Sequence, residues 1–187
     1  MAERLVVLSD IWGVKKGLWI TSYLGYLQQY YNIVFYDIQQ LANIDLAIKT
    51  EENLHKAFVE GGIDTAVAHL LKKEKKPSHY LAFSTGGTIA WKAGLKGLPM
   101  KSLYAVSATR VRLELLKPDC ESTTMLYGGK DEFRPDQEWY EKLDIEIEEL
   151  PGFGHECYTD EKIIAKVCQD LLFSVTGSRE KNTKKAV

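Results

Sequence analysis

Residues 80–93 of this chain, Tyr-Leu-Ala-Phe-Ser-Thr-Gly-Gly-Thr-Ile-Ala-Trp-Lys-Ala, decide its fold. The run Tyr80–Phe83 is apolar and predicts a buried strand, and the stretch after the two glycines has the composition of a helix. Ser84 stands between them, with Ala82 two residues before it and Gly86 two residues after it. A serine between small neighbours at a strand-to-helix junction predicts a sharp turn that presents the hydroxyl at its apex.

Similar strands recur along the chain, and amphipathic stretches separate them. This alternation predicts an α/β protein: a three-layer, doubly wound, mostly parallel six-stranded sheet with helices on both faces. The last run alternates isoleucine with glutamate, so we expect it at an edge of the sheet. The predicted strands are Leu5–Leu8, Ile33–Tyr36, Tyr80–Phe83, Ser102–Val106, Thr124–Tyr127 and Ile145–Glu149.

Two stretches between strands, and the stretch after the last strand, have helical spacing. Apolar residues recur at steps of 4, 3 and 4 through Ile20, Leu24, Leu27 and Tyr31, which indicates one helical face. A second helix is predicted from about Asp64 to Lys76, with its lysines at the negative end of the helix dipole. The final helix is predicted to follow Thr159 as its N-cap, and its first turn is acidic. Residues 38–62 are less regular.

Composition indicates one globular domain. The chain has 187 residues, 45% hydrophobic and 27% charged, which suffices for a core without disulfides or metal. We assign residues 1–176 to the domain and residues 177–187, which are polar, to a flexible tail. The three cysteines (Cys120, Cys157 and Cys168) form no CxxC pair, so neither a disulfide framework nor a metal site is expected.

Charge and hydropathy exclude several partners. Because the formal net charge is −2, the chain has no electrostatic reason to bind nucleic acid or an anionic membrane. No apolar run is long enough to span a membrane, and the run Leu5–Leu8 is too short for a secretory signal. We therefore expect a cytoplasmic protein.

A second polar loop follows the strand Thr124–Tyr127. It reads Gly128-Gly129-Lys130-Asp131, and an acid in such a loop is well placed to orient a histidine. Taken alone, an aspartate here is more typical of a turn or an N-cap. Glu132 and Asp136 are its competitors, and Asp136 beside Pro135 is typical of a helix start.

The third polar loop ends at His155, between the last strand and the final helix. Of the other histidines, His55 and His69 fall in helical segments, and His79 precedes a strand at the opposite end of the sheet. Ser84, Asp131 and His155 therefore each follow a different strand of one parallel sheet, and their loops open on the same edge. The order serine, acid, histidine is that of a hydrolytic triad in an α/β protein.

With these residues, the chain resembles the α/β-hydrolases, and within them the dienelactone hydrolase-like group. The resemblance covers most of residues 5–175 and depends on Asp10-Ile11-Trp12-Gly13-Val14, Phe83-Ser84-Thr85-Gly86-Gly87, Gly128-Gly129-Lys130-Asp131 and Gly154-His155. It implies a minimal α/β-hydrolase fold without a lid, in which the second strand lies outside the first and the third lies on its other side. It also implies an oxyanion hole made by the backbone N–H groups of Ile11 and Thr85.

The chain departs from that group at two positions. Dienelactone hydrolases have a cysteine where Ser84 stands, so this chain is expected to react as a serine hydrolase. They also carry an arginine four residues after the histidine, where this chain has Thr159. A dienelactone is therefore not the expected substrate.

The expected activity is cleavage of a small carboxylic ester or thioester through an acyl-enzyme, without metal or cofactor, by a monomer or homodimer. Asp10 either caps its loop, tunes the histidine or interacts with the nucleophile. The alternative is a non-catalytic domain that uses the same scaffold to bind a ligand or a partner protein, with the glycines after Ser84 cradling an anion. The candidate acyl pocket, for which core packing is an equal explanation at each position, consists of Trp12, Phe133, Phe153 and Tyr158.

Overall fold

The protein is built on a single six-stranded sheet. In the computed structural model, which describes residues 2–183, the strand order is β2-β1-β3-β4-β5-β6 and all five neighbouring pairs are parallel. The expected order and the edge position of the last strand are thus confirmed. The strands are β1 (Glu3–Leu8), β2 (Tyr31–Tyr36), β3 (Ser78–Phe83), β4 (Met100–Val106), β5 (Ser122–Gly128) and β6 (Glu146–Leu150).

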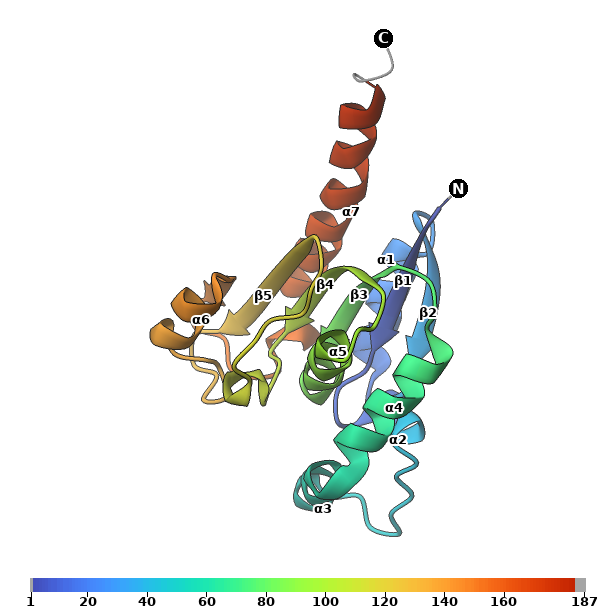
Figure 1. The fold of residues 1–187 in the computed structure, drawn as a ribbon. Helices are drawn as coiled ribbons and strands as arrows, with labels where there is room; N and C mark the ends of the chain where they lie inside the picture. Colours follow the sequence, from blue (N-terminus) through green and yellow to red (C-terminus); the bar gives the residue numbers. More distant parts are fainter. Residues whose placement is uncertain (1, 184–187) are drawn as a thin grey trace.

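Helices cover both faces of the sheet, so the expected three-layer fold is confirmed. Helices α4 and α5 lie together on one face, while α1 and α7 lie on the other (Figure 1). The helices are α1 (Leu18–Leu27), α2 (Ile38–Leu41), α3 (Glu51–Ala57), α4 (Ile63–Lys73), α5 (Thr85–Leu95), α6 (Gln137–Leu143) and α7 (Glu161–Thr183). Short 3-10 or π turns occupy Gly13–Lys15, Phe58–Gly62, Val111–Leu113 and Cys157–Thr159.

Alternate residues of the central strands enter two separate cores. Val6 and Tyr80 point to the α4–α5 side and pack there with Trp91, which is fully buried. Leu5 and Leu81 point to the α1–α7 side. Because β1 and β3 are covered on both faces, the last four residues of each strand, Leu5–Leu8 and Tyr80–Phe83, are all apolar, as parallel central strands require.

Three local predictions are wrong by one or a few residues. Tyr31 does not continue the face of α1 but begins β2. The helix expected to reach Lys76 ends at Lys73, and the next residue, Glu74, turns inward to bond Arg4 at 2.9 Å. Thr159 is not the N-cap of α7: the Asp160 side chain accepts the hydrogen bond from the Lys162 N–H, which leaves Thr159 in the preceding 3-10 turn.

The last helix is longer than predicted. Residues 177–183, assigned to the tail, continue α7, and residues 184–187 lie outside the described residues. Whether the tail is flexible stays a prediction. No helix within residues 2–183 combines the length and the apolar character needed to cross a bilayer.

Candidate active site

Ser84 occupies the strained turn that the sequence predicts between β3 and α5. Its backbone has φ 49° and ψ −121°, a conformation that non-glycine residues rarely adopt. The turn is held on the β4 side, where the Ser84 N–H donates to the Val106 carbonyl at 2.9 Å. Gly86 allows α5 to pass close to β1, because a Cβ there would lie 2.2 Å from the Ser9 carbonyl oxygen.

Ser84, His155 and Asp131 form a continuous hydrogen-bonded relay. The Ser84 Oγ lies 2.9 Å from His155 Nε2, and His155 Nδ1 lies 2.9 Å from Asp131 Oδ2. Asp131 is buried, and its other oxygen accepts from the Phe133 N–H at 2.9 Å. Because a carboxylate only accepts, Nδ1 carries the proton, and Nε2 is left to accept from the serine hydroxyl.

The backbone locks the acid loop and the histidine loop together. The Gly129 N–H donates to Leu150 O at 2.8 Å, and the Lys130 N–H donates to Phe153 O at 2.9 Å. At Gly128 the two loops are so close that a Cβ would lie 2.2 Å from the Gly154 carbonyl oxygen. Asp131 and His155 therefore lie on two loops whose backbones are hydrogen-bonded to each other.

Two backbone N–H groups beside Ser84 are available to bind an oxyanion. The Thr85 N–H is the first of α5, where helices leave their donors unpaired, and the Ile11 N–H lies in the loop after β1. Neither donates to an acceptor within residues 2–183. Both residues line one cleft with Ser84.

No protein-family model matches the sequence, and no curated protein matches it. Solved structures match it in fold. A proposed hydrolase of the alpha/beta superfamily from Xanthomonas campestris pv. campestris matches 92% of this chain and 99% of its own, with 16% identity and a TM-score of 0.67. The match to alpha/beta hydrolase domain-containing protein 10 from mouse covers 92% of this chain and 89% of the mouse chain, with 11% identity and a TM-score of 0.65. The match to a proposed dienelactone hydrolase from Klebsiella pneumoniae subsp. pneumoniae covers 92% of this chain and 85% of the other, with 16% identity and a TM-score of 0.63.

The chain has the α/β-hydrolase fold. The resemblance inferred from the sequence motifs is thereby confirmed at the level of the fold. In an α/β-hydrolase fold the carboxyl ends of the strands carry the site, and in this chain the loops of Ser84, Asp131 and His155 all follow those ends.

Asp10 caps the loop after β1 that carries Ile11. One of its oxygens accepts from the Trp12 N–H at 3.0 Å, and the other accepts from the Tyr158 hydroxyl at 3.3 Å. Burial raises the pKa of Asp10 to about 6, against the hydrogen bonds from Trp12 and Tyr158, which favour its charged form. Of the roles weighed for Asp10 from the sequence, the structure shows the capping contact.

The cleft around Ser84 has a volume of about 640 Å³. Of the four aromatic residues predicted to form a pocket, Trp12, Phe133 and Tyr158 line it, and the Phe133 ring meets the His155 ring edge-on at 5.2 Å between centroids. Phe153 does not line the cleft. Its side chain packs against the α1–α7 core instead, because its backbone is tied to the acid loop.

Two segments that line the cleft were not predicted from the sequence. Helix α3 contributes Glu51, Glu52, His55 and Lys56, and the segment after β4 contributes Thr109, Arg110 and Arg112. A local signal for α3 exists, since the Thr50 hydroxyl accepts from the Asn53 N–H at 3.1 Å as an N-cap. Nothing in the pattern says that this helix borders the site.

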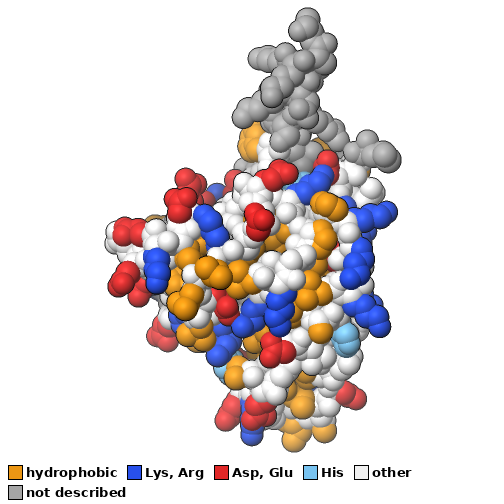
Figure 2. Space-filling view, in the orientation of Figure 1, with side chains coloured by type: hydrophobic (Ala, Val, Ile, Leu, Met, Phe, Trp, Pro, Cys, Tyr) orange, Lys and Arg blue, Asp and Glu red, His pale blue; other side chains and the backbone are white. Residues whose placement is uncertain are grey.

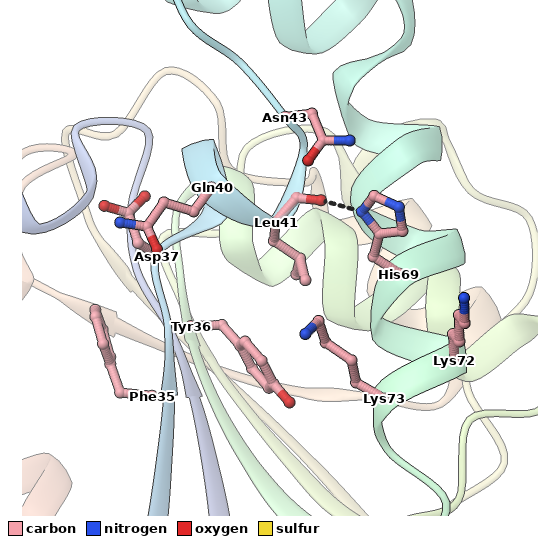
Figure 3. A pocket seen from close by; sticks show the side chains of 9 residues that line it. All are labelled: Phe35, Tyr36, Asp37, Gln40, Leu41, Asn43, His69, Lys72 and Lys73. Atoms are coloured by element: carbon pink, nitrogen blue, oxygen red, sulfur yellow. Dashed lines mark hydrogen bonds between the residues drawn. The ribbon is translucent and has the colours of Figure 1, made fainter.

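A larger groove, of about 780 Å³, lies between β2, α2 and α4, and Figure 3 shows its lining from Phe35 to Lys73. His69 Nδ1 contacts the Leu41 carbonyl there at 2.8 Å. On the face drawn in Figure 2, lysine and arginine side chains gather along the edge where α4 lies. The groove lining contains no serine, threonine or cysteine, and so no hydroxyl or thiol nucleophile. Within the described part of the chain, no three His, Cys, Asp or Glu side chains are grouped to hold a metal.

Proposed function

We propose that this protein is a serine hydrolase that cleaves a small carboxylic ester or thioester. One observation carries the proposal: Ser84, His155 and Asp131 are joined by two hydrogen bonds of 2.9 Å, with the serine on a strained turn. A serine is a weak nucleophile until an adjacent base takes its proton, and this arrangement supplies the base and the group that orients it. The hydrolases named among its structural neighbours support the same reaction class.

In the first half of the proposed reaction, Ser84 Oγ forms a bond to the substrate carbonyl carbon. His155 Nε2 takes the serine proton, and Asp131 stabilises the imidazolium that results. The carbonyl π electrons move onto oxygen, where the N–H groups of Ile11 and Thr85 bind the oxyanion; each donor is worth roughly 3 kcal/mol. When the C–O or C–S bond breaks, His155 returns the proton to the leaving alcohol or thiol.

In the second half, water replaces the leaving group. His155 takes a proton from the water, whose oxygen attacks the acyl carbon, and the tetrahedral intermediate collapses with release of Ser84. The His155 proton then passes to Ser84 Oγ, and the acid product leaves. The reaction needs no cofactor, and the protein acts as a monomer or homodimer on a small molecule that fits the Ser84 cleft.

A fluorophosphonate probe tests the proposal. The wild-type protein is expected to gain one adduct by intact-mass analysis, because an activated serine displaces fluoride from phosphorus, and Ser84→Ala is expected to gain none. Ser107→Ala is the matched control: Ser107 is also buried and has φ 51°, and its hydroxyl pairs with Cys157 Sγ at 3.5 Å. Its labelling should equal that of the wild type. A folded wild-type protein that gains no adduct would favour the non-catalytic binding domain instead.

A further inference from the structure

Gln39, on the short helix α2, touches the backbone of the candidate oxyanion loop. It is a buried polar residue, 5% exposed, and its Nε2 donates to the Ile11 carbonyl oxygen at 2.8 Å. Its Oε1 accepts from Lys49 Nζ at 2.7 Å. Gln39 itself does not line the Ser84 cleft.

The bond from Gln39 completes the restraint of both peptide groups that flank the Ile11 Cα. In the peptide between Ile11 and Trp12, the N–H donates to Asp10 Oδ1 at 3.0 Å and the carbonyl accepts from Gln39. In the preceding peptide, the Asp10 carbonyl accepts from the Gly13 N–H at 3.2 Å. N–H and C=O point in opposite directions in a trans peptide, so this anchored carbonyl directs the Ile11 N–H the other way.

Lys49 decides which end of the Gln39 amide faces the loop. A lysine ammonium group only donates, and a backbone carbonyl only accepts. With Lys49 on one side and the Ile11 carbonyl on the other, the amide satisfies both partners in one orientation alone. The sequence segment before α3 is thereby connected to the oxyanion loop through a single side chain.

We infer that Gln39 is a positioning residue for the oxyanion hole, and that Lys49 sets its orientation. The inference rests on the proposed hydrolase function. Gln39 holds the peptide between Ile11 and Trp12, and the Gly13 N–H holds the preceding peptide, which carries the Ile11 N–H. With both peptides fixed, the Ile11 N–H is aimed at the developing oxyanion before the substrate arrives, and such preorganisation is what makes a donor effective. Its loss leaves the loop in place, because Asp37 separately accepts from the Val14 N–H at 3.0 Å.

Gln40 provides a matched control on the same helix. It lines the groove between β2 and α4 rather than the oxyanion loop, as Figure 3 shows beside Asp37 and Leu41. Gln39→Leu and Gln40→Leu therefore remove the same amide from the two sides of α2. Any loss that comes only from weakening α2 should appear in both variants.

The experiment measures hydrolysis of p-nitrophenyl acetate and inhibition by phenylboronic acid. Boron accepts the Ser84 oxygen, whose proton passes to His155, and the tetrahedral adduct places a boron-bound oxygen in the oxyanion hole. For Gln39→Leu we expect kcat to fall about 10- to 100-fold with KM changed less than about twofold, since small misplacements of a reacting group cost that much. The inhibition constant of the boronic acid should rise by a similar factor, and Gln40→Leu should match the wild type in all three values.

A second variant covers the case in which Gln39→Leu does not fold. Lys49→Met leaves Gln39 in place and removes the group that orients its amide, so kcat and boronic acid affinity should fall in the same pattern, by about two- to fivefold. Folded Gln39→Leu or Lys49→Met proteins with the kinetics of Gln40→Leu would overturn the inference. A wild-type protein that does not hydrolyse the ester would overturn the proposed function, so the two failures are distinguishable.

Discussion

Replacing Asp10 by asparagine should change how the stability of the protein depends on pH. Asp10 is 2% exposed, and burial raises its pKa from 3.8 to about 6. Between these two pH values the folded protein keeps a proton that the unfolded chain has lost. Its free energy of unfolding therefore falls as pH rises through this window, and the loss is complete above pH 6.

The size of the loss follows from the separation between the two pKa values, 3.8 and about 6. At 1.36 kcal/mol for each pH unit, ionising Asp10 costs the folded state roughly 3 kcal/mol at neutral pH. Asparagine keeps an oxygen for the Trp12 N–H and stays neutral at every pH. The unfolding free energy of the Asn variant, measured relative to that of the wild type, should therefore rise by roughly 3 kcal/mol between about pH 4 and pH 7.

Urea unfolding, followed by tryptophan fluorescence at closely spaced pH values, measures this difference directly. Tyr158→Phe is the paired variant: it removes a hydrogen bond that favours the ionised form, so the pKa of Asp10 should rise further and the window should extend above pH 6. A constant difference in unfolding free energy between the Asn variant and the wild type across this range would refute the reasoning.

Three further predictions concern the relay and its supports. Ser84→Ala and His155→Ala should each lower kcat by about 10⁴-fold or more, and the double variant should lose little beyond either, since the two groups act as a unit; ester hydrolysis under single-turnover conditions measures this. Asp131→Asn should lower kcat by about 10³- to 10⁴-fold while the fold persists, because the amide no longer holds the required histidine tautomer; circular dichroism of the same samples separates the two effects. Gly86→Ala should lower the unfolding free energy by more than about 2 kcal/mol and slow fluorophosphonate labelling, because the new Cβ would meet the Ser9 carbonyl oxygen. Gly25→Ala on α1 is the control: the space around Gly25 is open, so this variant should be neutral or slightly stabilising in the same urea assay.

Much of the site could be predicted because its logic is local or topological. The run around Ser84 specifies a strand, a turn and a helix from a few neighbouring residues. Parallel strands present their carboxyl ends at one edge, so the loops of Asp131 and His155 were expected near Ser84 without any knowledge of distances. In the structure the relay atoms lie 2.9 Å apart.

Other features could not be predicted because they depend on how separate segments pack. Phe153 has the same apolar character as Phe133, yet one packs into the core and the other borders the cleft. Helix α3 carries its own N-cap signal, but its place on the cleft wall depends on the path of the chain after β2. The side chain of Gln39 meets Ile11 only in the folded chain, since 28 residues separate them.

The sequence alone determined the parallel sheet and the edge on which Ser84, Asp131 and His155 meet, while the order of the strands was implied by the resemblance to the α/β-hydrolases. Periodicity and strand connection carry that information, and both are properties of neighbouring residues. The tertiary structure alone decided which aromatic rings face the cleft, why Asp10 has a raised pKa and how Gln39 holds the oxyanion loop. Burial and hydrogen-bond partners depend on which distant segments meet in the folded chain, and no local pattern encodes that contact.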